Sequence, residues 1–156
     1  MTSLKNYNMA TLKDHVGHDF GASSPTLLDQ RRIDRFAACT GDEQWIHVDA
    51  ERARAESPFG QTIAHGLMVL SLVPSAHFEL GVYPADAKGV LNYGFDRVRF
   101  LSPVPSGSYV RLHIELVEAN EKQPGQWLMR CKNTAYASGD SWRPVMVAES
   151  LAMVMS

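Results

Sequence analysis

The stretch Leu67-Met68-Val69-Leu70-Ser71-Leu72-Val73-Pro74, which continues to Phe78 and Leu80, decides the fold. Its apolar side chains occupy the whole circumference of a helix, as expected of a helix that is buried on every side. We therefore predict one central helix over residues 67–80. Pro74 is expected to kink it, because a proline inside a helix removes one backbone hydrogen bond and crowds the preceding turn.

Beyond Gly81 the sequence changes from the period of a helix to the period of a strand. Residues 110–117 and 145–153 alternate apolar side chains with other residues, as strands do. Residues 90–100 and 126–137 predict two more strands, and turn-rich segments separate these elements. A buried helix followed by long antiparallel strands implies a sheet curled around that helix. The predicted class is therefore α+β, an antiparallel β-sheet wrapped around a central helix.

The size and charge of the chain limit its architecture and its partners. Its 156 residues predict a single domain over residues 1–156. Lys and Arg number 15 against 17 Asp and Glu, and the net charge is -2. No overall basic field attracts nucleic acid or an anionic membrane, so we expect neither as a partner.

The cysteines and the N-terminal sequence predict the cellular compartment. Cys39 and Cys131 lie far apart and form no C-x-x-C pair, which argues against a disulfide scaffold or a zinc ribbon. The N-terminus has no apolar signal core, and no stretch approaches the ~20 apolar residues of a membrane span. We expect a soluble, cytoplasmic protein, with residues 1–12 as a mobile N-terminal arm or an edge contact to a partner.

Two capped helices are predicted on either side of a short loop. Asp29 can cap a helix over residues 30–39, which Gly41 ends. Asp49 can cap a second, short helix over residues 50–56. The loop between them is Thr40-Gly41-Asp42-Glu43-Gln44-Trp45-Ile46-His47.

This loop carries residue types that can move protons. Asp42 and His47 lie five positions apart, although Asp and His beside a glycine turn are often only capping or hydrogen-bonding residues. A second polar cluster, residues 62–66, opens the apolar stretch, and a glycine amide at a helix start is a ready oxyanion donor. The two clusters suggest chemistry on an activated carbonyl, with Gly66 holding the oxygen.

The order of these pieces closely resembles the MaoC-like, (R)-specific enoyl-CoA hydratase/dehydratase family. The matching segments are residues 36–42, 45–49 and 63–66. The family pattern is a small residue, Gly, Asp, four residues, His, and a small residue six further on, which is Ala53 here. The resemblance covers the chain from about residue 28 to about residue 155.

The resemblance implies a fold, a reaction and roles for three groups. The fold is the hot-dog fold, and the protein is expected to be a homodimer without cofactors. The reaction interconverts trans-2-enoyl and (R)-3-hydroxyacyl thioesters of CoA or acyl carrier protein. Asp42 and His47 would orient and deprotonate one water and return a proton, and the amide of Gly66 would receive the enolate oxygen.

The chain departs from the commonest form of the family motif at one place. Most members carry Asn-Pro before the aliphatic residue and the His, where this chain has Gln44-Trp45. That variant resembles the branch called nodulation protein N-like. Trp45 either packs within the loop or forms a wall of the acyl pocket, since an indole supplies a large rigid surface.

Further residues are weaker candidates for substrate binding. Ile63 is one, and His65 is either a second substrate contact or a structural histidine that bonds backbone near the helix start. Arg97 is either a solvated strand residue, projecting from the same face as Arg99, or a contact to a CoA or carrier-protein phosphate. We predict no metal site, because the remaining histidines have no ligand spacing: His15, His18, His77 and His113.

Two other functions remain open from the sequence. Some hot-dog proteins hydrolyse acyl thioesters with a lone carboxylate, a role that Asp42 could fill. A non-catalytic module that binds acyl thioesters would need neither Asp42 nor His47 for ligand binding.

Overall fold

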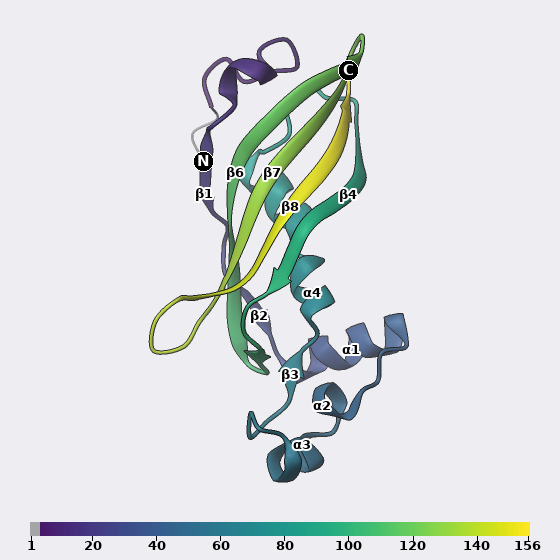
Figure 1. Ribbon diagram of the computed structural model, residues 1–156, viewed down its shortest axis with the longest axis vertical. Coiled ribbons are helices and arrows are strands. Elements are labelled where there is room, and N and C mark those ends of the chain that lie inside the picture. The colour runs from purple at the N-terminus through teal and green to yellow at the C-terminus, as the bar shows by residue number, and fades with distance from the viewer. Residues whose placement is uncertain (1–3) are drawn as a thin grey trace.

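The computed structural model describes residues 4–156 and shows a curved antiparallel sheet with helices against one face (Figure 1). The strand order is β1-β6-β7-β8-β4, and β2 pairs with the other end of β6. The strands are β1 Asp19–Ala22, β2 Thr26–Leu28, β4 Gly89–Phe100, β6 Ser108–Gln123, β7 Gln126–Ala137 and β8 Arg143–Met155. A separate small sheet joins β3, Ile63–Ala64, to β5, Val104–Pro105.

The period-two alternation of the sequence matches the burial of β6. There the side chains of Val110, Leu112, Ile114 and Leu116 are buried, and the residues between them are partly exposed. β8 also alternates, but its buried face is the other one: Met146, Ala148, Ser150, Ala152 and Val154 are buried, and the apolar residues Val147, Leu151 and Met153 are partly exposed. The four strands predicted from the sequence are therefore confirmed, and the two outlined only by their alternation, β6 and β8, are longer than predicted.

The predicted central helix is two helices. α4, Gly66–Leu70, packs against β8, and α5, Val73–Leu80, packs against β1 and β6. Pro74 lies in the first turn of α5. A backbone N–H at this position has no acceptor within the helix, so the missing N–H of proline costs no helical hydrogen bond. The prediction of one kinked helix was therefore wrong: the chain breaks before the proline.

Burial of this helical segment on all sides was also predicted wrongly. Met68, Val69 and Val73 are buried against the sheet. Leu67 and Phe78, in contrast, are 61% and 67% exposed. An apolar side chain on the exposed face of a core helix indicates a surface that something else can cover.

The N-terminal segment is docked onto the rest of the protein. Residues 1–3 lie outside the described part of the chain. Leu12 is fully buried at the start of the 3-10 helix Leu12–His15, the amide of Met9 donates to the Asp86 carboxylate at 3.0 Å, and the Tyr7 hydroxyl donates to the carbonyl of Val82. The predicted mobile arm is therefore wrong for residues 4–12.

Three helices lie together at one end of the sheet (Figure 1): α1 Gln30–Thr40, α2 Trp45–Val48 and α3 Ala50–Glu56. Both predicted caps are confirmed, because Asp29 and Asp49 each accept from a backbone amide 2.9 Å away. Gly41 ends α1 in the left-handed conformation at φ 79°, which glycine adopts without strain. α2 was not predicted, since four residues are too few to show a helical period.

Within residues 4–156, no helix combines the length and the apolar character that a membrane crossing requires.

Candidate active site

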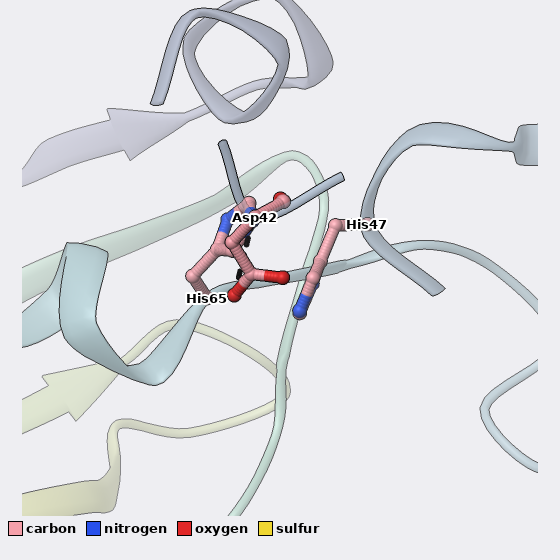
Figure 2. A group of neighbouring side chains, drawn as sticks. All are labelled: Asp42, His47 and His65. Atoms are coloured by element: carbon pink, nitrogen blue, oxygen red, sulfur yellow. Dashed lines mark hydrogen bonds and ion pairs between the residues drawn. The ribbon is translucent and has the colours of Figure 1, made fainter. Parts of the chain in front are cut away.

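Three titratable side chains from separate elements meet beside the start of α4 (Figure 2). Asp42 lies in the loop after α1, His47 lies on α2, and His65 directly precedes α4. One carboxylate oxygen and one nitrogen of each ring all lie within 4.8 Å of one another. Eighteen residues separate His47 from His65 in the sequence, so only the fold brings the two rings together.

His47 is held in one orientation and is 7% exposed. Its Nδ1 lies 2.7 Å from the carbonyl oxygen of Ile63, which can only accept, so Nδ1 carries the proton. The neutral ring therefore leaves Nε2 as a proton acceptor. A backbone carbonyl that sets a histidine tautomer in this way is a common feature of proton-transfer sites.

Burial lowers the pKa of His47 below its ordinary value of 6.5. The Ile63 carbonyl and the Asp42 carboxylate oppose this shift, because both favour the charged ring, and the neighbouring His65 adds to it. The net direction is downward, so His47 is neutral at pH 7. It can serve as a general base there.

For the reaction that the family resemblance implies, hydration of an enoyl thioester, the pKa of His47 predicts how kcat/KM depends on pH. Protonated His47 cannot accept a proton, so kcat/KM should fall as the pH decreases through this pKa. Because the pKa is lowered, the midpoint of the acidic limb should lie below pH 6.5. The profile of kcat/KM between pH 4.5 and 9 measures it, and a midpoint above 6.5 would contradict the role of His47.

Asp42 is the exposed member of the pair formed with His47: 53% of its side chain is accessible to solvent. Figure 2 shows its carboxylate directed toward the two rings. A water hydrogen-bonded to two groups lies about 2.8 Å from each. The separation of at most 4.8 Å between the carboxylate and a ring nitrogen of His47 is therefore short enough for one shared water.

His65 contacts both members of the pair. Its Nε2 lies 2.8 Å from the backbone oxygen of Asp42, and its ring stacks on His47 with centroids 3.7 Å apart. The prediction that His65 bonds backbone is confirmed. The acceptor lies in the Asp42 loop, however, and not at the helix start.

An apolar cavity of about 280 Å³ opens beside His47. Gly66 lies in its wall, and as the first residue of α4 it has an N–H without an intrahelical acceptor. A methyl group on Gly66 would lie 3.0 Å from the ring of Phe100, so glycine is what allows this ring to close over the helix start. The remaining lining residues are Ile63, Ala64, Val69, Leu101, Ser102, Pro103, Val104 and Val145.

The predicted site residues divide into two groups. His47, Ile63 and Gly66 line the cavity. Trp45 does not: the guanidinium of Arg52 lies 4.5 Å from the centre of its ring, which is a packing contact on the neighbouring helix.

Arg97 does not line the cavity either. It is 80% exposed on β4 and forms an ion pair of 2.8 Å with Glu149 on β8. A β-bulge between Asp96 and Arg99, with Arg97 at φ 52°, interrupts the alternation of the strand. The regular strand spacing from which Arg97 and Arg99 were expected to share a face is therefore absent at this point of β4.

The far wall of the cavity was missed in the sequence. Phe100, Leu101 and Val145 come from the end of β4, the following loop and the start of β8. Their apolar character was visible, but no local pattern links them to residues 47–66. Only the closure of the sheet around α4 places them there.

The triad Asp42, His47 and His65 also satisfies a distance criterion for a metal site. The two rings are stacked at an interplanar angle of 26°, however, so their in-plane lone pairs run nearly parallel and do not converge on one ion. In addition, Nδ1 of His47 and Nε2 of His65 are already bound to backbone carbonyls. This arrangement suits proton transfer better than chelation.

Comparison with known proteins identifies the family of this chain. A family model described as "MaoC like domain" matches residues 11–137. Nodulation protein N of Rhizobium leguminosarum bv. viciae is 37% identical over 151 residues, which is 97% of this chain and 93% of that protein. A 3-hydroxyacyl-thioester dehydratase Z of Mycobacterium tuberculosis is 40% identical over 144 residues, 92% of this chain and 93% of that protein.

Solved structures agree with the sequence comparison. The unliganded R-hydratase PhaJ1 from Pseudomonas aeruginosa superposes with a TM-score of 0.76 at 26% identity, covering 97% of this chain and 87% of that one. The fold is accordingly the hot-dog fold of these hydratases, as predicted. With a matching family model over most of its length and two relatives aligned along nearly their whole sequences, the chain belongs to the MaoC-like dehydratase family.

Proposed function

We propose that the protein interconverts trans-2-enoyl and (R)-3-hydroxyacyl thioesters by adding or removing water. The observation that carries this proposal is one apolar cavity whose wall contains the buried base His47 and Gly66, the first residue of α4. Asp42 lies within 4.8 Å of the base. The (R) configuration comes from the family and from the R-hydratase that shares the fold.

The proposed step balances with these groups alone. Asp42 and His47 hold one water, and Nε2 of His47 takes a proton as the water oxygen bonds to the β-carbon. The electron pair of the double bond moves onto the thioester oxygen, where the N–H of Gly66 binds the enolate. The proton then passes to the α-carbon, so the elements of one water are added without a metal or redox cofactor.

The substrate is proposed to be an acyl thioester of CoA or acyl carrier protein. The cavity wall is apolar apart from His47, Ser102 and backbone, which suits an acyl chain and not a charged group. Its volume of about 280 Å³ accommodates only part of a long chain in the single protomer.

The direct test is an assay with a series of trans-2-enoyl-CoA thioesters. Hydration should remove the absorbance of the conjugated enoyl group and release no free thiol. Release of thiol without prior loss of the double bond would establish a thioesterase instead. Binding without either change would leave a non-catalytic acyl-thioester module.

We also propose that the protein is a homodimer. β4 is an edge strand, and it exposes apolar side chains that include Leu91, Tyr93 and Phe100. Long apolar edges are normally covered, and two-fold pairing is the simplest way to cover one. Sedimentation at micromolar concentration should give twice the mass of 17.3 kDa, and a monomer would contradict the proposal.

The position of Trp45 predicts a packing role. Trp45→Ala should lower the melting temperature by a few degrees, because the contact with Arg52 is lost. Trp45 lies outside the cavity lining, so the ratio of kcat/KM for short and long enoyl-CoA substrates should not change. A shift of this ratio would show that the indole reaches the acyl chain.

A further inference from the structure

His65 occupies the centre of the site although it does not line the cavity. It is 2% exposed and lies between two rings: His47 at 3.7 Å and Phe36 at 5.0 Å between centroids. Its own backbone precedes Gly66 at the start of α4. One side chain thus contacts the base, the loop of the carboxylate and the helix that presents the amide.

The hydrogen bond to the loop determines the tautomer of His65. The backbone oxygen of Asp42 can only accept, so Nε2 of His65 carries the proton and donates over 2.8 Å. That bond anchors the backbone of Asp42, whose own amide lies 3.4 Å from the Thr40 hydroxyl. The same imidazole therefore holds the carboxylate loop and covers one face of the base.

The other nitrogen of His65 shows that the ring is not optimised for stability. Nδ1 is buried and has no hydrogen-bond partner among residues 4–156. A buried polar atom without a partner destabilises the folded state, and an apolar ring of the same shape would avoid that cost. A histidine at this position is explained by what its Nε2–H does for the neighbouring groups.

We infer that His65 is a positioning residue that holds Asp42 and His47 in register for the shared water. The inference rests on the proposed hydratase function. His65 transfers no proton itself, since Nε2 is bound to the Asp42 carbonyl and Nδ1 is enclosed by protein. It acts through the position of the Asp42 loop and through the stacked ring of His47.

Two substitutions separate the hydrogen bond from the stacked ring. His65→Phe keeps a flat ring beside His47 and removes both nitrogens. His65→Gln places an amide N–H near the position of Nε2 and loses the ring. His113→Gln is the matched control, because His113 lies on β6 and its Nε2 pairs with Asp19 at 3.1 Å.

The kinetic test measures kcat, KM and melting temperature for the three variants. His65→Phe should lower kcat at least tenfold with KM within threefold of wild type, and its melting temperature should not fall. His65→Gln should retain more of kcat than His65→Phe, because its amide N–H replaces the lost donor to the Asp42 carbonyl. His113→Gln should have the wild-type kcat. Wild-type kcat in His65→Phe, or equal losses in the Phe and Gln variants, would overturn the inference.

Backbone amide hydrogen exchange tests the inference without any substrate. Amides of residues 41–44 should exchange faster in His65→Phe than in wild type, and at close to the wild-type rate in His65→Gln. Unchanged exchange in His65→Phe would overturn the inference even if its kcat falls. A wild-type protein that hydrates no enoyl thioester would overturn the proposed function, and the exchange result would still decide whether His65 anchors the loop.

Discussion

Asp42→Asn and His47→Gln are each expected to lower kcat for hydration of an enoyl thioester by at least about 10²-fold, the usual contribution of general acid/base catalysis. Asparagine lacks the charged carboxylate that holds the water, and glutamine at position 47 cannot take the proton of that water. Both variants should fold, because Asp42 is half exposed in a loop and Gln keeps an N–H donor for the region of the Ile63 carbonyl. Steady-state kinetics at saturating substrate, with circular dichroism as a folding check, measure the effect.

The double variant and a neighbouring acid provide the controls. Asp42 and His47 are proposed to act on the same water, so the double variant should lose little more than the worse single variant. Glu43→Gln removes a carboxylate from the adjacent, exposed position and should keep near wild-type kcat. Near-normal activity in either single variant would refute the role of that residue, and additive losses would show that the two groups act separately.

Asn133→Ala is expected to destabilise the protein by about 3 kcal/mol, because it leaves buried polar groups without partners. Asn133 is fully buried on β7, where its Oδ1 accepts from Nε2 of His77 at 2.7 Å. Its Nδ2 donates to the hydroxyl of Ser150 and to the carbonyl of Cys131, each at 2.9 Å. The side chain thereby joins α5 to two strands of the sheet.

His77 makes this loss larger than that of an ordinary hydrogen bond. Burial lowers the pKa of His77, so the ring is neutral and its Nε2–H needs an acceptor inside the protein. Its Nδ1 already accepts from the hydroxyl of Tyr83 at 3.0 Å and cannot take over that function. Removing the oxygen of Asn133 therefore leaves the buried Nε2–H of His77 without an acceptor.

Thermal unfolding measures the effect of Asn133→Ala. For a chain of this size, about 3 kcal/mol corresponds to a fall in Tm of about 6–12 °C. Asn120→Ala is the matched control, since Asn120 is exposed on β6, and its Tm should stay within about 2 °C of wild type. A fall of less than 2 °C in Asn133→Ala would show that water or rearrangement replaces the lost bonds.

Parts of the site could be predicted because its main residues are close in sequence. Asp42 and His47 are held by the end of α1 and by α2, so their mutual position follows from a short segment with strong local signals: the Asp29 cap, the Gly41 stop and the Asp49 cap. The long strands could be predicted for the same reason, since period-two alternation is a local consequence of one buried face.

The partners that lie far apart in sequence could not be predicted in this way. From the sequence, Arg97 was either a solvated strand residue or a contact to a phosphate. It is 80% exposed, and the bulge in β4 and the ion pair with Glu149 on β8 were not visible in the sequence. From the sequence, His65 was either a substrate contact or a structural histidine that bonds backbone near the helix start. Only the fold shows that the backbone acceptor lies in the Asp42 loop. The docked N-terminal segment was missed because its two buried apolar residues, Met9 and Leu12, lie among polar residues.

The sequence alone determined the α+β class and the long strands, because each depends on the periodicity of neighbouring residues. The proposal that Asp42 and His47 transfer the proton came from the resemblance of their motif to the MaoC-like family, since their spacing alone also fits capping residues. The tertiary structure alone decided the wall that Phe100 and Val145 add to the cavity and the stacking of His65 on His47. These features depend on contacts between segments distant along the chain. Such contacts form only when the sheet closes around the helices, so no local pattern can encode them.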